Sequence, residues 1–174
     1  MQSDVDLTQR ASYRYFETEK IRFSDTDMIG HVNNVAFAAL LESGRTAYAH
    51  AHLFPHMPQG LVGVMARIEI DYRRELHWPG AVDIGSRVVA IGQRSYAIGQ
   101  GIFRGEECVT TGRTTLVMID RETRKSSLLP EPYRNVLAAL MTVTDAKQES
   151  TSFCKKKQKL LQIGLRVEAT LMLY

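Results

Sequence analysis

The sequence lacks the features that mark membrane-spanning, secreted and disulfide-stabilised proteins. No run of 18 apolar residues occurs among its 174 residues, so no transmembrane helix is expected. The first residues, MQSDVDLTQRASYRYF, contain no apolar core of a signal peptide. Only two cysteines are present, Cys108 and Cys154, and they form no paired motif. These absences predict a cytoplasmic protein that has no disulfide framework and does not associate with membranes.

The main body of the chain also lacks an excess of charge of either sign. The formal charge of +3 comes from 22 Lys/Arg and 19 Asp/Glu. Residues 145–174 contain six of these basic and three of these acidic residues, which leaves 16 of each in residues 1–144. The KKKQK run at 155–159 is typical of a solvated tail. Because a nucleic-acid-binding protein needs a basic face on its folded part, no nucleic-acid partner is expected.

Several catalytic motifs are missing as well. The sequence contains no G-x-S-x-G elbow, Walker loop, G-x-G-x-x-G, H-E-x-x-H or C-x-x-C. His50, His52 and His56 lie within seven residues, but a helix directs the first two to different sides, and neither cysteine nor carboxylate completes a ligand set. We therefore expect neither a metal nor a cofactor.

One segment has a clear helical pattern. NNVAFAALLESGRTAYAHAHL places apolar residues at helical spacing and on nearly all sides, which is typical of a buried helix. Asn33 or Asn34 can cap the start of this helix with a side-chain oxygen, and Pro55 and Pro58 lie just beyond its end.

The remaining patterns are mostly those of strands. Residues 62–73 alternate apolar and other residues with a period of two, which predicts a long strand with one apolar face. Further strands are expected at 13–23, 81–92, 94–104 and 107–119, with a short second helix after Pro130. Together these elements predict an α+β arrangement in which a curled antiparallel sheet of about five strands wraps around one long central helix. The opposite face of the sheet has little cover and several glycines, so it could pair with another subunit.

Three regions follow from these patterns. Residues 1–12 form an N-terminal extension, and residues 13–144 form the domain. Residues 145–174 form a polar, basic tail, which is either one added strand or an extension unrelated to the domain.

Four stretches together identify a family resemblance: RFSDTDMIGHVNN, LLESGR, IEIDYRRELHWPG and GRTTLVMID. They resemble the hotdog-fold acyl-CoA thioesterases of the 4-hydroxybenzoyl-CoA thioesterase-like family, over about residues 13–142. The resemblance implies hydrolysis of an acyl thioester of coenzyme A or acyl carrier protein. It also implies a homo-oligomer, a dimer or a dimer of dimers, with active sites at the subunit interface. The form GHVNN is closer to the acyl-carrier-protein thioesterases, in which a histidine of this motif is functional.

The resemblance assigns the catalytic carboxylate to Asp27. This side chain could attack the thioester directly or activate water, while free amides at the start of the helix hold the developing oxyanion. The alternative, purely structural interpretation is that Asp27 only forms a turn, which is also the expected role of Asp25. His31 either protonates the leaving sulfur, donates to the carbonyl, or packs in the loop.

Other residues have two interpretations each. Asn33 caps the helix or orients substrate and water. Glu42 positions water, or pairs with Arg45 three residues later. The predicted catalytic residues are Asp27, His31, Asn33 and Glu42, and the predicted substrate-binding residues are Gly30, Val32, Asn34, Arg67 and Arg73. The alternative functions are an acyl-thioester hydratase or dehydratase, and a non-catalytic acyl-CoA-binding domain.

Overall fold

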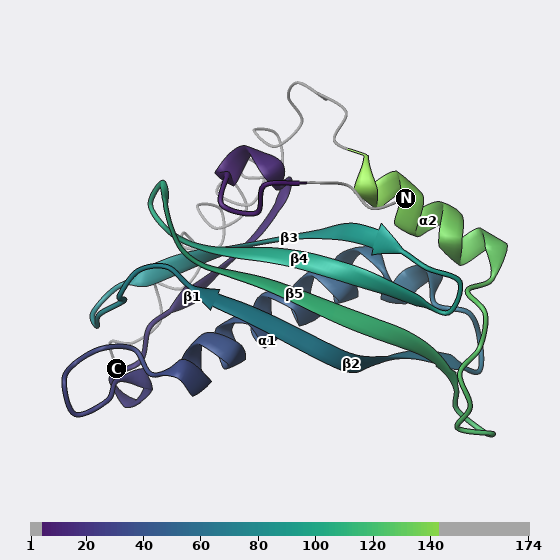
Figure 1. The fold of residues 1–174 in the computed structure, drawn as a ribbon, viewed down its shortest axis with the longest axis horizontal. Coiled ribbons are helices and arrows are strands. Elements are labelled where there is room, and N and C mark those ends of the chain that lie inside the picture. Colours follow the sequence, from purple (N-terminus) through teal and green to yellow (C-terminus); the bar gives the residue numbers. More distant parts are fainter. Residues whose placement is uncertain (1–4, 143–174) are drawn as a thin grey trace, which may run out of the picture. The chain divides into compact units, whose positions relative to one another are not determined.

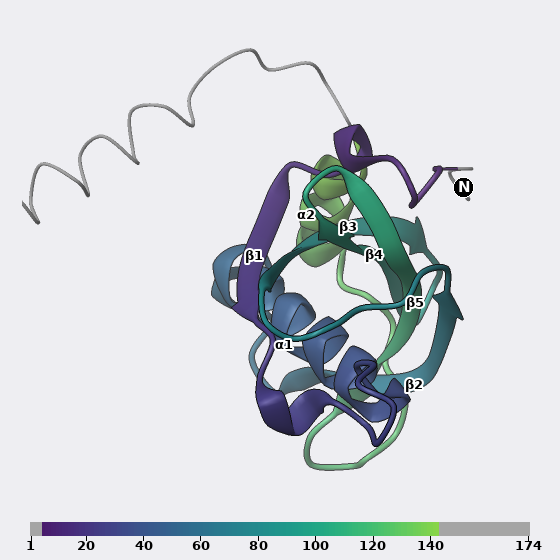
Figure 2. The same ribbon diagram turned by 90° about the vertical axis from the view of Figure 1, so that its left-hand side faces the viewer.

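The computed structural model describes residues 5–142, so the predictions for residues 145–174 lie outside the described part. It contains five strands and two α-helices, which are β1 (Tyr15–Lys20), α1 (Asn34–His52), β2 (Leu61–Tyr72), β3 (Ala81–Ile91), β4 (Ser95–Arg104), β5 (Glu107–Asp120) and α2 (Glu131–Met141). The strands form one antiparallel sheet in the order β1-β3-β4-β5-β2. The sheet curls around α1 (Figures 1 and 2), which confirms the predicted α+β hotdog class and its single central helix.

The long helix begins and ends where the sequence indicates. Asn33 is the N-cap of α1, and its side-chain oxygen accepts a hydrogen bond from the Ala36 N–H at 2.9 Å. At the other end, Leu53 is the C-cap of α1 and precedes a short 3-10 helix, Phe54–His56, that contains Pro55. Among residues 5–142, no helix is long and apolar enough to cross a membrane.

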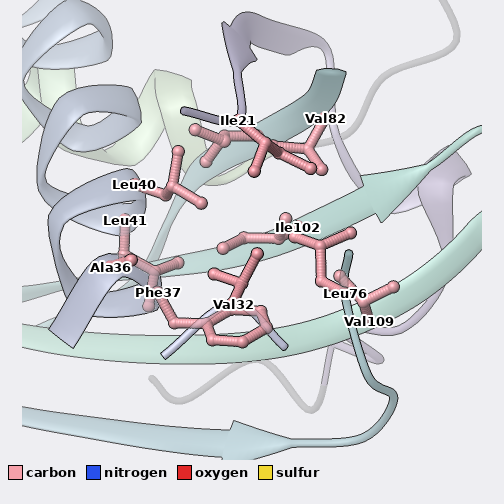
Figure 3. Packing of buried hydrophobic residues seen from close by; sticks show 11 residues of the cluster. Ile21, Val32, Ala36, Phe37, Leu40, Leu41, Leu76, Val82, Ile102 and Val109 are labelled. Atoms are coloured by element: carbon pink, nitrogen blue, oxygen red, sulfur yellow. The ribbon is translucent and has the colours of Figure 1, made fainter. Parts of the chain in front are cut away.

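The core between α1 and the sheet consists of two apolar clusters. The first surrounds the N-terminal half of α1 and includes Leu41 and Ile102 (Figure 3). The second surrounds the C-terminal half and includes Tyr48, with Tyr133 and Leu137 contributed by α2. Because α1 and α2 both bury apolar side chains in the second cluster, that cluster joins the two helices.

A buried polar group also links α1 to the sheet. Gln100 of β4 is fully buried, and its side-chain amide donates to the Leu41 carbonyl at 2.9 Å and to Ser86 Oγ at 3.0 Å. The Arg45 guanidinium donates to Gln100 Oε1 and Thr114 Oγ1, both at 3.3 Å. These bonds satisfy polar groups that would otherwise be costly to bury, so they hold α1 in one position on the sheet.

The prediction of one apolar face along residues 62–73 is wrong for the first half of β2. A bulge between Met65 and Arg67 shifts the register against β5. Before the bulge Val64 pairs with Val117 and is 42% exposed, whereas after it Ile70 pairs with Gly112 and packs against the core. The extra residue therefore reverses the face on which the alternating apolar residues lie.

The sequence suggested that the outer face of the sheet has little cover, but over β3 and β4 this face is covered by the chain's own N-terminal segment. The Tyr13 ring fills the space above Gly85, where an added Cβ would lie 2.5 Å from it. Leu7 lies over Gly99 in the same way, and the Tyr13 hydroxyl donates to the Leu7 carbonyl at 2.7 Å. Arg10 binds Asp83 of β3 at 2.7 Å. Residues 7–13 are therefore packed on the sheet through its glycines.

Candidate active site

The loop before α1 is organised by the Asp27 side chain. Its Oδ1 accepts hydrogen bonds from the N–H groups of Ile29 at 2.9 Å and His31 at 3.1 Å. The Asp27 N–H in turn donates to the His31 carbonyl at 2.8 Å. One carboxylate oxygen therefore forms the expected turn. The other oxygen, Oδ2, has no hydrogen-bond partner within residues 5–142, and the residue is exposed. Asp27 can thus hold the loop through Oδ1 and at the same time leave Oδ2 available to a bound molecule.

Gly30 allows this loop to turn. Its φ of +84° lies in the left-handed region that residues with a Cβ rarely adopt. An added Cβ would meet no atom within 4 Å, so the requirement for glycine is conformational rather than steric. The Gly30 N–H donates to the Asp27 carbonyl at 3.1 Å, which closes the turn.

The polar groups of Asn33 are used by the fold. Its oxygen caps α1, and its side-chain NH₂ donates to the Asp25 carbonyl at 2.9 Å. Asp25 itself accepts from the Arg22 N–H at 2.7 Å in a short capping turn. Capping is thus one of the two roles predicted for Asn33, and turn formation is the role expected of Asp25; together they set the position of the helix start.

An open pocket of about 610 Å³ lies at this helix start. Its lining includes Asp27, Asn33 and Asn34, so three of the predicted site residues meet there; the full set is Ser24, Asp25, Asp27, Asn33, Asn34, Val35, Ala36 and Ala39. The N–H groups of Asn34 and Val35 have no acceptor in the part of the chain that the structure describes. Such first-turn amides, together with the helix dipole, favour an anionic oxygen.

His31 lies at the rim of the loop and faces two residues, Glu75 and His77, for which the sequence predicted no role. Its Nε2 is 3.6 Å from Glu75 Oε2, and its ring meets the His77 ring edge-on with centroids 4.8 Å apart. Glu75 and His77 are more than 40 positions away in the sequence, and no spacing motif joins them to His31. Only the pairing of the two segments, in which the Val32 N–H donates to the Leu76 carbonyl at 2.7 Å, brings them together.

Glu42 lines a different pocket from Asp27. That cavity of about 510 Å³ lies between α1 and the sheet, and it also includes Arg45, Met65 and Tyr96 in a mostly apolar lining. Glu42 is eight residues beyond Asn34, which places it about 12 Å further along the helix axis. The predicted pairing with Arg45 is electrostatic only: burial lowers the pKa of Arg45, and the charge of Glu42 opposes that shift.

The remaining predicted substrate-binding residues lie away from both pockets. The side chain of Val32 is 4% exposed and belongs to the first apolar cluster, so its contribution is to anchor the loop. Arg67 pairs with Glu69 at 2.9 Å on the exposed part of β2. The Arg73 guanidinium donates to Thr111 Oγ1 at 3.3 Å.

Comparisons with known proteins agree with this architecture. Residues 21–140 match the family model described as the Thioesterase-like superfamily. The uncharacterized protein YsmA of Bacillus subtilis strain 168 is 28% identical over 120 residues, which cover 67% of this chain and 80% of YsmA. The crystal structure of the PA5185 protein from Pseudomonas aeruginosa has 25% identity and a TM-score of 0.67, covering 79% of this chain and 99% of that one. The structure of a Thermus thermophilus thioesterase complexed with coenzyme A and Zn has 28% identity and a TM-score of 0.64. The match covers 75% of this chain and 96% of that one.

Proposed function

The chain belongs to the thioesterase-like superfamily, and on that premise we propose that it hydrolyses acyl thioesters of coenzyme A or of acyl carrier protein. The products are a free carboxylic acid and a thiol. One observation carries the proposal: the Asp27 oxygen and the amides at the start of α1 that have no hydrogen-bond partner within residues 5–142 share one pocket. The structure of the relative from Thermus thermophilus contains coenzyme A, which supports a substrate of this class.

The chemistry needs a positioned carboxylate and an oxyanion site. The thioester carbonyl oxygen accepts from the Asn34 and Val35 N–H groups, which stabilise the charge that develops when the carbonyl is attacked. Asp27 Oδ2 either removes a proton from the attacking water or attacks the carbonyl carbon itself to give a mixed anhydride that water then hydrolyses. In both routes the carbon–sulfur bond breaks, and the thiolate leaves and takes up a proton from water or from His31, the predicted acid.

The proposed enzyme works as a homodimer or a dimer of dimers. Strand β2 is an edge of the sheet, and Val64 and Met65 are 42% and 50% exposed there. An exposed apolar edge favours pairing with a second copy of the chain. In such an assembly the apolar pocket beside Glu42 belongs to one subunit and can receive the acyl group of a thioester held at Asp27 of the other. In this arrangement Glu42 lies near the thioester that the other subunit holds, whereas within one chain Glu42 and Asp27 line different pockets.

The test is thiol release from a panel of short, long and aromatic acyl-CoAs, followed with a thiol-reactive dye. We expect saturable release that is well above the rate in buffer for at least one class of acyl group. Loss or gain of water on the acyl chain without thiol release would instead identify a hydratase or dehydratase. Saturable binding with neither reaction would identify a binding domain, and both of these results would overturn the proposal.

A further inference from the structure

A cluster of metal-ligand side chains lies beside the candidate active site. The Nε2 atoms of His31 and His77 are each 3.6 Å from Glu75 Oε2, and the three ligand atoms lie within 4.8 Å of one another. In a tetrahedral zinc site, ligand atoms about 2.0–2.2 Å from the ion lie about 3.3–3.6 Å apart. The observed triangle therefore needs only small rotations of partly exposed side chains to close around one ion.

The tautomer of His77 supports this geometry independently. Its Nδ1 lies 3.1 Å from the Gly30 carbonyl oxygen. Because a carbonyl can only accept, Nδ1 carries the proton and donates it, which leaves the lone pair on Nε2 in the neutral ring. That lone pair faces the Glu75 carboxylate, which is also an acceptor. Metal-binding histidines are commonly oriented by this kind of bond from the second ring nitrogen to a backbone carbonyl.

The backbone holds the ligands in place. His31 and His77 form a bridge between two extended segments, and the neighbouring Val32 and Leu76 are 4% and 0% exposed in the apolar core. Burial of these neighbours fixes the segments from which the ligands project. The side chains of His31, Glu75 and His77 are 31%, 68% and 49% exposed, so solvent reaches the open side of the cluster.

We propose that His31, Glu75 and His77 bind one divalent transition-metal ion, with a fourth position open to water or to another ligand. Two imidazoles and one carboxylate favour Zn²⁺ or Co²⁺ over the oxygen-preferring Mg²⁺ and Ca²⁺. The bound ion joins the loop of residues 27–33 to the segment before β3. Since the His31 N–H donates to Asp27 Oδ1, the ion also steadies the proposed catalytic carboxylate. It occupies His31 Nε2, so His31 transfers no proton from that atom while the metal is bound.

The proposal does not depend on thioester hydrolysis, and it is tested by metal binding alone. The full chain without a polyhistidine tag is dialysed against Zn²⁺ at pH 7.5, and Co²⁺ is used as a spectroscopic probe. We expect one tightly bound ion per chain and visible absorption bands of a four- or five-coordinate Co²⁺ site. His77→Ala and Glu75→Gln should each weaken binding at least tenfold, because each removes a ligand. The matched control His50→Ala, an exposed histidine on α1, should bind as the wild type does.

The variants separate loss of the site from loss of the fold. His77 and Glu75 are both exposed, so each variant should keep the wild-type circular dichroism spectrum; if one fails to fold, the other carries the test. Absence of binding by the wild type at 100 µM Zn²⁺ would overturn the proposal. So would undiminished binding by a folded His77→Ala or Glu75→Gln variant, because the ion would then be held elsewhere in the chain.

Discussion

The buried amide of Gln100 makes a measurable contribution to stability through its contacts with α1. Replacement by leucine keeps the approximate size of the side chain but removes its bonds to the Leu41 carbonyl, to Ser86 Oγ and to the Arg45 guanidinium. A net loss of about 1 kcal/mol for each neutral bond and about 2 kcal/mol for the bond to a charge gives about 4 kcal/mol. Burial of extra apolar surface offsets about 1 kcal/mol of this, so we expect a destabilisation of about 3 kcal/mol.

Urea unfolding followed by circular dichroism measures this change. All variants are compared at one protein concentration, because the stability of an oligomer depends on it. Gln93→Leu is the matched control: Gln93 is exposed in the turn between β3 and β4, and the same substitution there should change stability by less than about 0.5 kcal/mol.

A double-mutant cycle tests the cause of the loss. Arg45→Leu combined with Gln100→Leu removes both partners, so neither is left buried and unpaired. The double variant should therefore be at least 1 kcal/mol more stable than the sum of the single effects predicts. A Gln100→Leu variant as stable as wild type, or effects that add without coupling, would refute the idea that this polar network fixes α1 on the sheet.

Three other perturbations have expected outcomes. Gly44→Ala should destabilise the protein by about 1–3 kcal/mol in urea unfolding despite the better helix propensity of alanine, because the new Cβ would lie 2.4 Å from Ile84 Cγ2; a more stable variant would contradict this. Asn33→Ala should cost about 1 kcal/mol through loss of the cap and should also lower the thiol-release rate, and an unchanged rate would contradict its role in placing the helix start. Burial lowers the pKa of His52, so its contribution to stability is present above the unfolded pKa of about 6.5 and is lost as pH falls through the folded pKa. The free energy of unfolding should fall less between pH 7.5 and 5.5 in His52→Gln than in wild type or in the control His50→Gln. An equal fall in all three proteins would contradict this prediction.

Much of the fold could be predicted because its signals are local. The start of α1 depends on Asn33, whose capping bond reaches only three residues along the chain. The strand boundaries follow short turn residues such as those at 92–94 and 105–106, and the observed strand ends differ from the predicted ones by at most three residues. These features could be predicted since the interactions that determine them lie within a few residues of each other.

The features that the sequence did not reveal depend on contacts between distant segments. Apolar residues alternate through Val62, Val64 and Ala66 without any local sign of a bulge, and only the pairing of β2 with β5 reverses their faces. The glycines on the outer face looked like an open surface, whereas Tyr13 and Leu7 fill the space above them. The same limit applies at the site. Asp27 and Asn34 could be grouped from one short stretch, but Glu75 and His77 could not.

The most direct test of the central claim is the turnover of Asp27→Asn. The asparagine oxygen can still accept from the Ile29 and His31 N–H groups, so the loop should remain folded while the basic, negatively charged group is lost. We expect thiol release to fall by about 100-fold or more, with an unchanged circular dichroism spectrum. Asp120→Asn is the matched control, because the Asp120 carboxylate likewise accepts two backbone N–H bonds, at 3.1 and 2.8 Å, and it should keep wild-type turnover. A folded Asp27→Asn variant that releases thiol at the wild-type rate would contradict the account.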